Sequence, residues 1–397
     1  MALHPHGRPL WAEIDLAALA HNVRALKALA GSARLAAVVK ANAYGHGAVP
    51  IARAAVAAGA DLLAVICVEE GEQLRQGGIA VPVLVLGHSY PGDAERIVGQ
   101  RLTPIVTTLE LAEALSREAQ GAGIQQPLHI KVDTGLNRYG LQPAEAVALA
   151  QRLREMPSLT VEGICTHFAE ADAADKTHAR EQFRLFMSVA EHLPWIPIRH
   201  VSNTAALLSL PEFNLEMVRP GIGLYGCSPS EDVSGPELRP VLSLKGRIVR
   251  LHRIESGDSV SYGRTWRAQR PSTIALVACG YGDGLPRALS NRGQMLVRGQ
   301  RVPIVGRVCM DMSMLDVTEV RGVSEGDEVV MIGRQESESI PVEEIASLCG
   351  TISYEILCRI AARVERVYTG SNQDHRSALA TNAGVSAARR SGREPAG

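Results

Sequence analysis

The sequence has few aromatic residues and no excess of charge of either sign. Phe, Trp and Tyr together make up 4% of its 397 residues, and its formal net charge is −1. A chain this close to neutrality has no electrostatic reason to bind a polyanion such as nucleic acid, or an anionic membrane surface. We therefore expect neither of them as a partner.

Long apolar runs are also missing. No stretch of the chain approaches the ~20 apolar residues that a membrane-spanning helix needs. The first residues, MALHPHGRPLWAEIDL, contain neither an apolar signal core nor a small-residue cleavage site, so secretion is not indicated. We expect a cytoplasmic protein.

Cysteine is present, but not in a pattern that predicts disulfides or a zinc site. The cysteines are odd in number, scattered and mostly inside apolar runs, and no two of them have C-x-x-C spacing. Such residues are typical of reduced core thiols, and we expect no metal site. They are Cys67, Cys165, Cys227, Cys279, Cys309, Cys349 and Cys358.

What the sequence does contain is a long alternation of strand-like and helical patterns. A chain of 397 residues is long enough for two domains. From about residue 11 to residue 239, helical patterns separate eight short apolar runs, and no G-x-G-x-x-G follows any early run. This predicts an α/β fold with an N-terminal (β/α)8 TIM-type barrel rather than an open doubly wound sheet. The runs are Leu35–Val39, Leu62–Ile66, Val81–Leu86, Leu102–Thr107, Leu128–Asp133, Thr160–Phe168, Ile198–Ser202 and Met217–Gly226.

The pattern of apolar and polar residues changes near residue 240. From 240 to 369, partly alternating runs and turn sequences such as ESGD and SEGD predict a mostly β C-terminal domain. One short helix is expected there, at Pro341–Leu348. Residues 370–397 have almost no large apolar side chains, and we expect them to form a disordered tail.

Polar residues directly follow several of the predicted barrel strands. Lys40 comes at the end of the first run, and polar clusters follow the fifth to eighth runs. In α/β barrels the C-terminal ends of the strands meet at one mouth, where the chemistry takes place. The sequence therefore predicts a functional site at this mouth, with Lys40 as a candidate reactive amine.

Seven separated segments resemble, in order, motifs of the bacterial alanine racemase family. They are VVKANAYGHG, KVDTGLNRYG, RPGIGLYG, VSYGRTW, ACGYGDGLPR, GRVCMDMSMLDV and GTISYEILCRI, and the likeness runs from about Trp11 to Tyr368. The resemblance implies a pyridoxal-phosphate-dependent isomerase that interconverts L-alanine and D-alanine and supplies D-alanine for peptidoglycan. It also implies a homodimer, in which the C-terminal domain of one subunit covers the barrel mouth of the other.

The resemblance makes Lys40 and Tyr262 the catalytic pair. Lys40 would form the Schiff base with the cofactor and take the α-proton of D-alanine, while Tyr262 would take that of L-alanine. Arg219 would stand against the pyridine nitrogen, where many such enzymes have a carboxylate. Because arginine donates hydrogen bonds and cannot accept them, it would keep this nitrogen unprotonated and weaken the electron sink, which suits racemisation over transamination.

Further roles follow from the same resemblance. Arg138 and the backbone amide of Met310 would hold the substrate carboxylate. Tyr281 and Asp311 would lie near the entrance, and Lys131, which is carbamylated in some family members, would orient Arg138. The remaining cofactor contacts would come from Tyr44, His167, Asn203, Thr204, Gly221, Ile222 and Tyr354.

Three alternatives stay open at this point. One is a related racemase of serine or of a broader range of amino acids, although such relatives often carry a membrane domain or a signal sequence. Another is a barrel-type decarboxylase, which would call for a glycine-rich phosphate loop that we do not find. The third is a non-enzymatic pyridoxal phosphate carrier, which is usually a lone barrel without a second domain.

Overall fold

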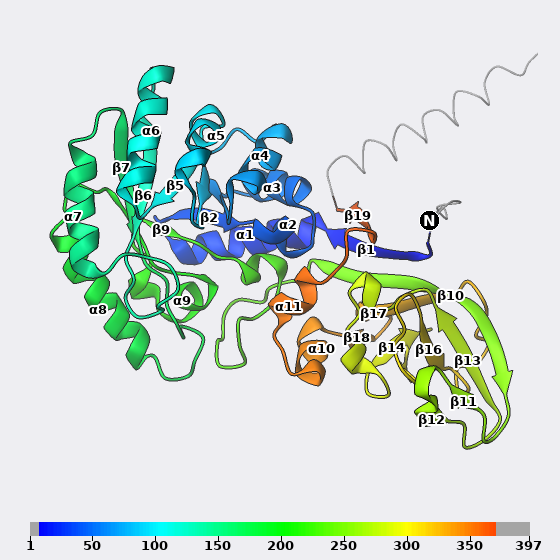
Figure 1. Ribbon diagram of the computed structural model, residues 1–397. Coiled ribbons are helices and arrows are strands. Elements are labelled where there is room, and N and C mark those ends of the chain that lie inside the picture. Colours follow the sequence, from blue (N-terminus) through cyan, green and yellow to red (C-terminus); the bar gives the residue numbers. More distant parts are fainter. Residues whose placement is uncertain (1–7, 371–397) are drawn as a thin grey trace, which may run out of the picture.

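The computed structural model describes residues 8–370. Within this range the chain forms a barrel and a mostly β lobe, which lie side by side (Figure 1). The predicted fold class is thereby confirmed. The expected disordered tail, 370–397, lies outside the described residues apart from Gly370.

Eight parallel strands form the barrel: β2 (Arg34–Val38), β3 (Leu62–Val65), β4 (Val83–Val85), β5 (Thr103–Val106), β6 (Gln126–Lys131), β7 (Leu159–Cys165), β8 (Ile198–His200) and β9 (Met217–Val218). They follow one another in space as β8-β7-β6-β5-β4-β3-β2-β9. Each predicted run overlaps one of them. The last run is a strand over only two residues, because Pro220 has no N–H to continue a ladder and Gly221 leads into the 3₁₀ helix Ile222–Tyr225.

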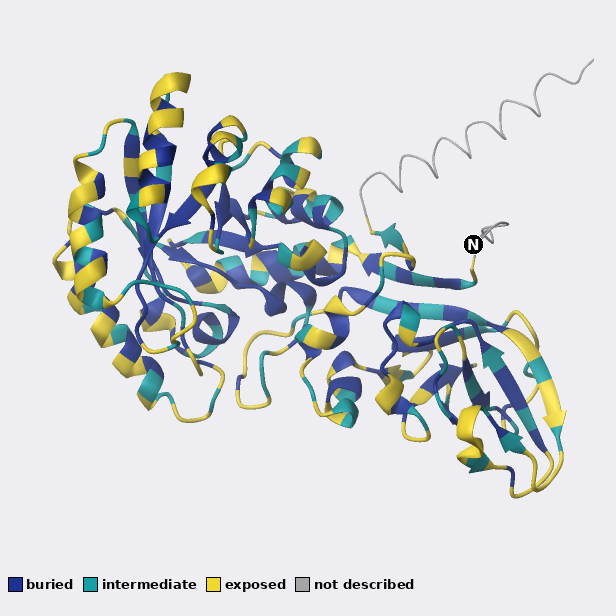
Figure 2. Ribbon diagram, in the orientation of Figure 1, coloured by how far each residue is buried: buried dark blue, intermediate teal, exposed yellow. Residues whose placement is uncertain are grey.

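Helices cover the outside of the barrel. Their outer faces are exposed, whereas most strand residues are buried (Figure 2). Burial on both faces of a strand explains the continuous apolar runs of the sequence. The first helix begins where Asp15 accepts hydrogen bonds from the amides of Ala17 and Ala18, at 2.8 and 2.9 Å. The helices are α1 (Leu16–Ala30), α3 (Ala48–Ala57), α4 (Val68–Gln76), α5 (Ala94–Gly99), α6 (Leu109–Ala122), α7 (Pro143–Arg154), α8 (Thr177–Glu191) and α9 (Thr204–Ser209).

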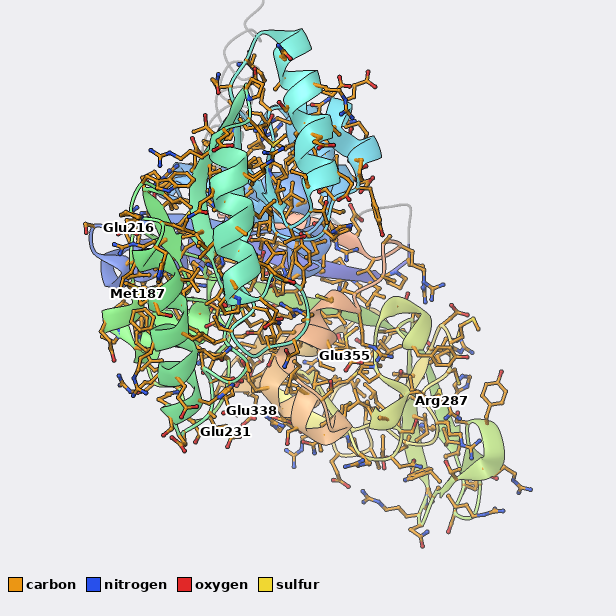
Figure 3. The ribbon with its side chains drawn as sticks, turned by 60° about the vertical axis from the view of Figure 1, so that its left-hand side comes forward. Met187, Glu216, Glu231, Arg287, Glu338 and Glu355 are labelled. Carbon is orange, nitrogen blue, oxygen red and sulfur yellow. The ribbon has the colours of Figure 1, made fainter. Side chains whose placement is uncertain are left out.

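The barrel is nearly closed at the seam between β8 and β9. No ladder joins these two strands in residues 8–370, but the amide of Arg219 donates a hydrogen bond to the carbonyl of Ser202 at 2.8 Å. Arg199 on β8 also donates from its amide and its Nε to the carboxylate of Glu216, both at 2.9 Å. Figure 3 labels Glu216 on the barrel part of the molecule. The seam therefore fixes the ends of both strands, and with them the polar residues that follow.

The lobe is built on a nine-stranded sheet that includes the first strand of the chain. β1 (Leu10–Asp15) pairs antiparallel with β10 (Leu242–Ile254) and parallel with β19 (Glu365–Thr369). Because the lobe takes residues from both ends of the chain, the division at residue 240 stays a prediction. The other strands of the lobe are β11 (Ser259–Val260), β12 (Trp266–Arg267), β13 (Ser272–Val277), β14 (Gln294–Val297), β15 (Gln300–Pro303), β16 (Ser313–Asp316), β17 (Glu328–Gln335) and β18 (Glu338–Ile340).

Two helices of the lobe lie towards the barrel. α10 (Val342–Cys349) matches the helix predicted at Pro341–Leu348 to within one residue, and α11 (Ser353–Cys358) follows it. α11 packs so closely on the barrel that a Cβ on Gly45 would lie 2.3 Å from the carbonyl oxygen of Leu357. Over the described part of the chain, no helix is both long and apolar enough to cross a membrane.

The last strand of the lobe reaches the same loop. Arg366 donates from Nε to the carbonyl of Gly45, and the hydroxyl of Tyr368 donates to the carbonyl of His46, each at 3.1 Å. The lobe therefore holds the loop that follows Lys40 in its own chain.

Candidate active site

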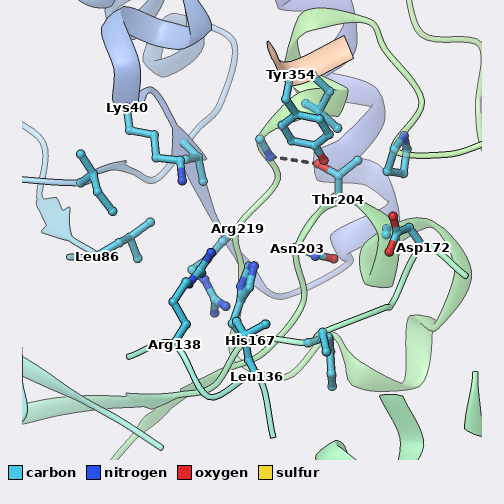
Figure 4. A pocket seen from close by; sticks show the side chains of 18 of the residues that line it. Lys40, Leu86, Leu136, Arg138, His167, Asp172, Asn203, Thr204, Arg219 and Tyr354 are labelled. Atoms are coloured by element: carbon cyan, nitrogen blue, oxygen red, sulfur yellow. Dashed lines mark hydrogen bonds between the residues drawn. The ribbon is translucent and has the colours of Figure 1, made fainter. Parts of the chain in front are cut away.

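A cavity of about 510 Å³ opens at the C-terminal ends of the barrel strands (Figure 4). Every barrel strand, or the loop directly after it, contributes to the lining, and α11 adds residues from the lobe. The structure thus brings most of the predicted site residues together in one place. Those that line the cavity are Lys40, Tyr44, Lys131, Arg138, His167, Asn203, Thr204, Arg219, Gly221, Ile222 and Tyr354.

Four predicted residues lie elsewhere. Tyr262, Tyr281, Met310 and Asp311 are on the lobe and do not line the cavity of their own chain. Tyr262 and Met310 are 71% and 55% exposed. The segments around Tyr281 and Met310 adjoin, because the amide of Tyr281 donates a hydrogen bond to the carbonyl of Cys309 at 3.0 Å.

Lys40 stands at the start of a strained turn. It is the first residue of α2 (Lys40–Tyr44), and residues 41–44 have φ values of 52°, 53°, 53° and 51°. These are left-handed values, which cost an ordinary L-residue roughly 1–2 kcal/mol each. A run of four such residues persists only where its surroundings impose it, and strain of this kind concentrates at functional sites.

Two polar side chains hold this left-handed turn. Glu70 accepts hydrogen bonds from the amides of Ala41 at 2.6 Å and Ile66 at 2.8 Å, so it ties the turn to the end of β3. Asn42 accepts a hydrogen bond from the amide of Ala48 at 2.9 Å and so caps α3. Sequence reasoning missed Glu70, because a glutamate in the first turn of a helix is common.

His46 holds the turn from inside the core. It is fully buried, and its Nδ1 lies 3.0 and 2.9 Å from the carbonyl oxygens of Ala43 and Tyr44. Nδ1 therefore carries the proton, and Nε2 is a buried acceptor without a partner in the described structure. Burial lowers the pKa of His46 to about 4, so the ring is neutral near pH 7.

The amine of Lys40 is turned into the cavity (Figure 4). Its burial, and after that the positive charge of Arg138, hold the pKa of Lys40 below the usual value for lysine. A lower pKa increases the fraction of neutral amine, which is the form that attacks an aldehyde and accepts a proton. The geometry therefore suits Lys40 both as an attachment point and as a base.

Arg219 is fixed so that one N–H stays available. Its Nη1 donates to Nδ1 and to the carbonyl of His200, at 2.6 and 2.7 Å. Its Nη2 donates to the carbonyls of Thr166 at 2.8 Å and Val201 at 3.3 Å. The Nε–H has no acceptor among the described residues. The guanidinium group is thus a donor held in place for a ligand that can accept.

Behind Arg219 lies a chain of two buried histidines. Because arginine only donates, Nδ1 of His200 is the acceptor, and its Nε2–H donates to Nδ1 of His129 at 2.7 Å. Burial, followed by the charge of Arg219, lowers the pKa of His200 well below its usual value and that of His129 to about 3. Sequence reasoning did not single out His129, although it shares the inner face of β6 with Lys131 at i, i+2 spacing.

A small cradle lies at the start of the Ile222–Tyr225 turn. The amide of Gly221 donates to the hydroxyl oxygen of Thr204 at 2.9 Å (Figure 4). A Cβ at position 221 would lie 2.6 Å from the hydroxyl of Tyr44, so only glycine leaves this space open. Burial raises the pKa of both Tyr44 and Tyr354, which keeps their hydroxyls as neutral donors. Amides and hydroxyls gathered in this way suit a phosphate.

The charge of the cavity also favours a ligand with a phosphate group. Its lining includes four cationic side chains, Lys40, Lys131, Arg138 and Arg219, and one carboxylate, Asp172. Such a balance suits a ligand with anionic groups, as a phosphate and a carboxylate would provide. Across residues 8–370, no cluster of three or more His, Cys, Asp or Glu side chains could hold a metal ion.

Comparisons with known proteins cover both parts of the chain. Residues 14–229 match the family model described as alanine racemase, N-terminal domain, and residues 241–368 match alanine racemase, C-terminal domain. The chain is 46% identical over 367 residues to the alanine racemase of Halothermothrix orenii, which covers 91% of this chain and 97% of that protein.

Solved structures give the same result. The alanine racemase of the D-cycloserine producer Streptomyces lavendulae matches with a TM-score of 0.88 and 36% identity, over 93% of this chain and 99% of that one. The Bacillus anthracis alanine racemase with bound L-Ala-P matches with a TM-score of 0.86 and 36% identity, over 92% of this chain and 97% of that one.

We predict that His46 makes the protein lose stability in mild acid. The pKa of its ring is about 4 in the folded chain, against about 6.5 for an exposed histidine, so the unfolded state binds the proton more tightly. The contribution of His46 is complete above about pH 6.5 and falls towards pH 4, by about 1.4 kcal/mol per pH unit. Urea unfolding at pH 7 and pH 5 should show a smaller loss for His46→Gln than for the wild type.

The exposed ring of His252 provides the control for this prediction. His252→Gln should lose as much stability between the two pH values as the wild type does. An equal loss in His46→Gln would show that His46 does not contribute.

Proposed function

The chain belongs to the alanine racemase family, and on this premise we propose that it interconverts L-alanine and D-alanine with pyridoxal 5′-phosphate as its cofactor. The observation that carries the proposal is Lys40, whose amine of lowered pKa stands in a cationic cavity at the barrel mouth. Relatives along most of the chain are alanine racemases, which disfavours a racemase of another amino acid. The complete second lobe argues against a non-enzymatic carrier.

The residues around the cavity fit this cofactor. The Gly221 cradle and the neighbouring hydroxyls suit its phosphate, while His167 and Asn203 would contact its ring. Joined to Lys40, the cofactor would supply a conjugated ring that acidifies the α-hydrogen of alanine. The groups that would hold the phosphate are the hydroxyls of Tyr44, Thr204 and Tyr354 and the amides of Gly221 and Ile222.

Arg219 would determine how strongly charge is drawn away from the α-carbon. Four hydrogen bonds fix its guanidinium group, and its Nε–H remains free to donate. A donor at the ring nitrogen keeps that nitrogen unprotonated, so charge stays closer to the α-carbon. A proton then returns to the α-carbon readily, as racemisation requires.

Reversal of a stereocentre needs a proton carrier on each of its two faces. Lys40 would exchange the α-proton of D-alanine, and Tyr262 that of L-alanine. Because Tyr262 is 71% exposed and does not line the cavity of its own chain, we propose that it serves the cavity of a second subunit. Met310 would act in the same way, with its amide holding the substrate carboxylate beside Arg138. The active unit would then be a homodimer with two shared sites.

Lys131 would orient Arg138. Its amine has no hydrogen-bond partner in the described part of the chain and lies 5.1 Å from the centre of the Tyr139 ring. Burial lowers the pKa of Lys131, which favours the neutral amine that reacts with carbon dioxide. The resulting carbamate would be an anion able to pair with Arg138. Tyr281 and Asp311 would lie near the entrance to the shared site.

D-alanine made at this site would supply peptidoglycan synthesis. The reaction would take place in the cytoplasm, where the building blocks of the wall are assembled. All seven cysteines, which lie within residues 8–370, are free thiols, as suits a reducing compartment.

Isotope incorporation tests the proposed reaction. Purified protein with pyridoxal phosphate and L-alanine in deuterium oxide should form D-alanine that carries deuterium at the α-carbon, detected by chiral chromatography with mass spectrometry. Lys40→Ala should lose at least ~10⁴-fold in rate, together with the visible absorbance of lysine-bound cofactor. Lys27→Ala, on the outside of α1, should retain both. Bound cofactor without D-alanine would refute the reaction, and full activity of Lys40→Ala would refute the role of Lys40.

Replacing Tyr262 should distinguish proton removal from L-alanine from proton removal from D-alanine. In Tyr262→Phe, racemisation should fall by roughly 10²–10⁴-fold in both directions. D-alanine should still exchange its α-hydrogen with deuterium oxide, because Lys40 can remove the proton and return it, whereas L-alanine should not. Proton NMR of the α-hydrogen follows both reactions. Tyr90→Phe, at a 68% exposed tyrosine of the barrel, is the control. Wild-type exchange of L-alanine by Tyr262→Phe would exclude the tyrosine as base.

Mixing two inactive variants should test the shared site. A heterodimer of Lys40→Ala and Tyr262→Phe chains has one site with both defects and one site with none. After unfolding and joint refolding in equal amounts, roughly a quarter of the wild-type activity should return if subunits pair at random in a twofold dimer. No recovery, despite mixed dimers seen by native mass spectrometry, would place both residues in one chain's site.

A further inference from the structure

Ser261, the residue before Tyr262, has an unusual backbone conformation. Its φ is 68° and its ψ is 179°. This region is almost restricted to glycine, because a Cβ collides there with the neighbouring backbone. A serine is held in it only if contacts of its side chain or its surroundings compensate for the strain.

The Ser261 side chain makes such contacts with the loop that carries Met310. Its hydroxyl donates a hydrogen bond to the carbonyl of Arg307 at 2.6 Å and lies 3.5 Å from the sulfur of Cys309. The backbone of Gly306 passes close by, since a Cβ there would lie 2.6 Å from the Cβ of Ser261. We refer to residues 261–264 as the tyrosine turn and to residues 306–312 as the methionine loop.

Each segment also has contacts of its own, and the side chain of Asn291 links their ends. Asn291 donates from Nδ2 to the hydroxyl of Thr265 at 3.0 Å and accepts a hydrogen bond from the amide of Gly306 at 2.6 Å. The tyrosine turn connects β11 to β12, which pair with each other. The methionine loop is held by the segment around Tyr281, where the amide of Gly282 donates to the carbonyl of Met310 at 2.8 Å. Over residues 8–370, no backbone hydrogen bond joins the two segments. The hydroxyl of Ser261 bonds directly from the turn to the loop, and the guanidinium group of Arg307 packs on Gly263, where a Cβ would lie 3.0 Å from its Cζ.

We propose that Ser261 is a positioning residue that fixes Tyr262 relative to Met310. The proton carrier and the anchor of the substrate carboxylate would then enter the partner's cavity as one unit. A strained serine is suited to this role, because relaxation of its backbone would turn Tyr262 away from the methionine loop. The inference rests on the proposed function and adds a residue to its machinery.

Ser261→Gly tests the inference, because glycine adopts these angles without strain and lacks the hydroxyl. We expect this variant to fold and dimerise with a melting temperature equal to or above that of the wild type. Its affinity for pyridoxal phosphate, titrated by absorbance, should be unchanged. Its kcat/KM should nevertheless fall by roughly 10- to 100-fold, since small misplacements of reacting groups have effects of this size.

Isotope effects identify which proton transfer is affected. Because the two enantiomers have equal free energies, kcat/KM must fall equally in both directions. The primary isotope effect should increase for α-deuterated L-alanine, whose deuteron Tyr262 removes, and decrease for α-deuterated D-alanine. If Ser261 served only folding, its replacement would not change the two isotope effects in opposite directions.

Two further variants complete the experiment. Ser261→Ala keeps the strained backbone but lacks the hydroxyl. It should therefore change the two isotope effects in the same opposite directions, and its melting temperature should be lower than that of Ser261→Gly. Ser256→Ala removes a hydroxyl that donates to the carbonyl of Gln269 at 3.2 Å in the same lobe, and it should behave as the wild type.

Wild-type kcat/KM and isotope effects in Ser261→Gly would overturn the inference. So would a melting temperature below that of the wild type or loss of the dimer, because the serine would then stabilise the fold rather than strain it. Failure of the wild type to racemise alanine would instead refute the proposed function.

Discussion

The left-handed turn after Lys40 depends on contacts from both parts of the chain, and the site depends on that turn. Its four residues together carry a strain of roughly 4–8 kcal/mol, which is comparable with the whole stability of an average domain. Contacts with Glu70 of the barrel, and with α11 and Arg366 of the lobe, stabilise the turn and offset this strain. The direction of Lys40 is therefore a property of the complete two-part fold, not of the local sequence.

Burial rather than paired carboxylates sets the protonation of the site. The cation of Arg219 is 5% exposed, and its partners are carbonyl groups and the neutral ring of His200. Acceptors of this kind satisfy the donors without adding negative charge, so the cavity keeps its positive potential. The same burial lowers the pKa of Lys40 and favours its neutral form. One physical cause thus raises the neutral fraction of Lys40 and leaves the cavity with a positive potential.

The sequence predicted the parts of the fold whose signals are local. Parallel strands buried on both faces read as apolar runs, so all eight barrel strands could be found. β1 could not be assigned, because its partners β10 and β19 lie far away along the chain. The strand expected at Met217–Gly226 was too long, since apolar residues continue past Pro220 into a turn that is equally buried.

The site shows the same division between local and distant signals. The place of Lys40 at a strand end and the resemblance of two segments to family motifs indicated Lys40 and Arg219. KANAY itself gives no sign of a left-handed turn, which Glu70 helps to hold from a different helix. Ser261 was missed for a similar reason. A glycine at this position would have suggested an unusual backbone conformation, whereas a serine gives no such signal. Exposure of Tyr262 and Met310 also depends on the fold.

The place of β1 in the lobe has a consequence for synthesis on the ribosome. The barrel can form while translation continues, but β1 must wait for β10 and then for β19, which ends at Thr369. At ~5–20 residues per second this wait lasts roughly 20–70 s, during which β1 has open edges. The final strand also brings Arg366 and Tyr368 to the loop after Lys40. A chain released too early would therefore lack both a closed sheet and a correctly held lysine, so completion of translation and assembly of the site coincide.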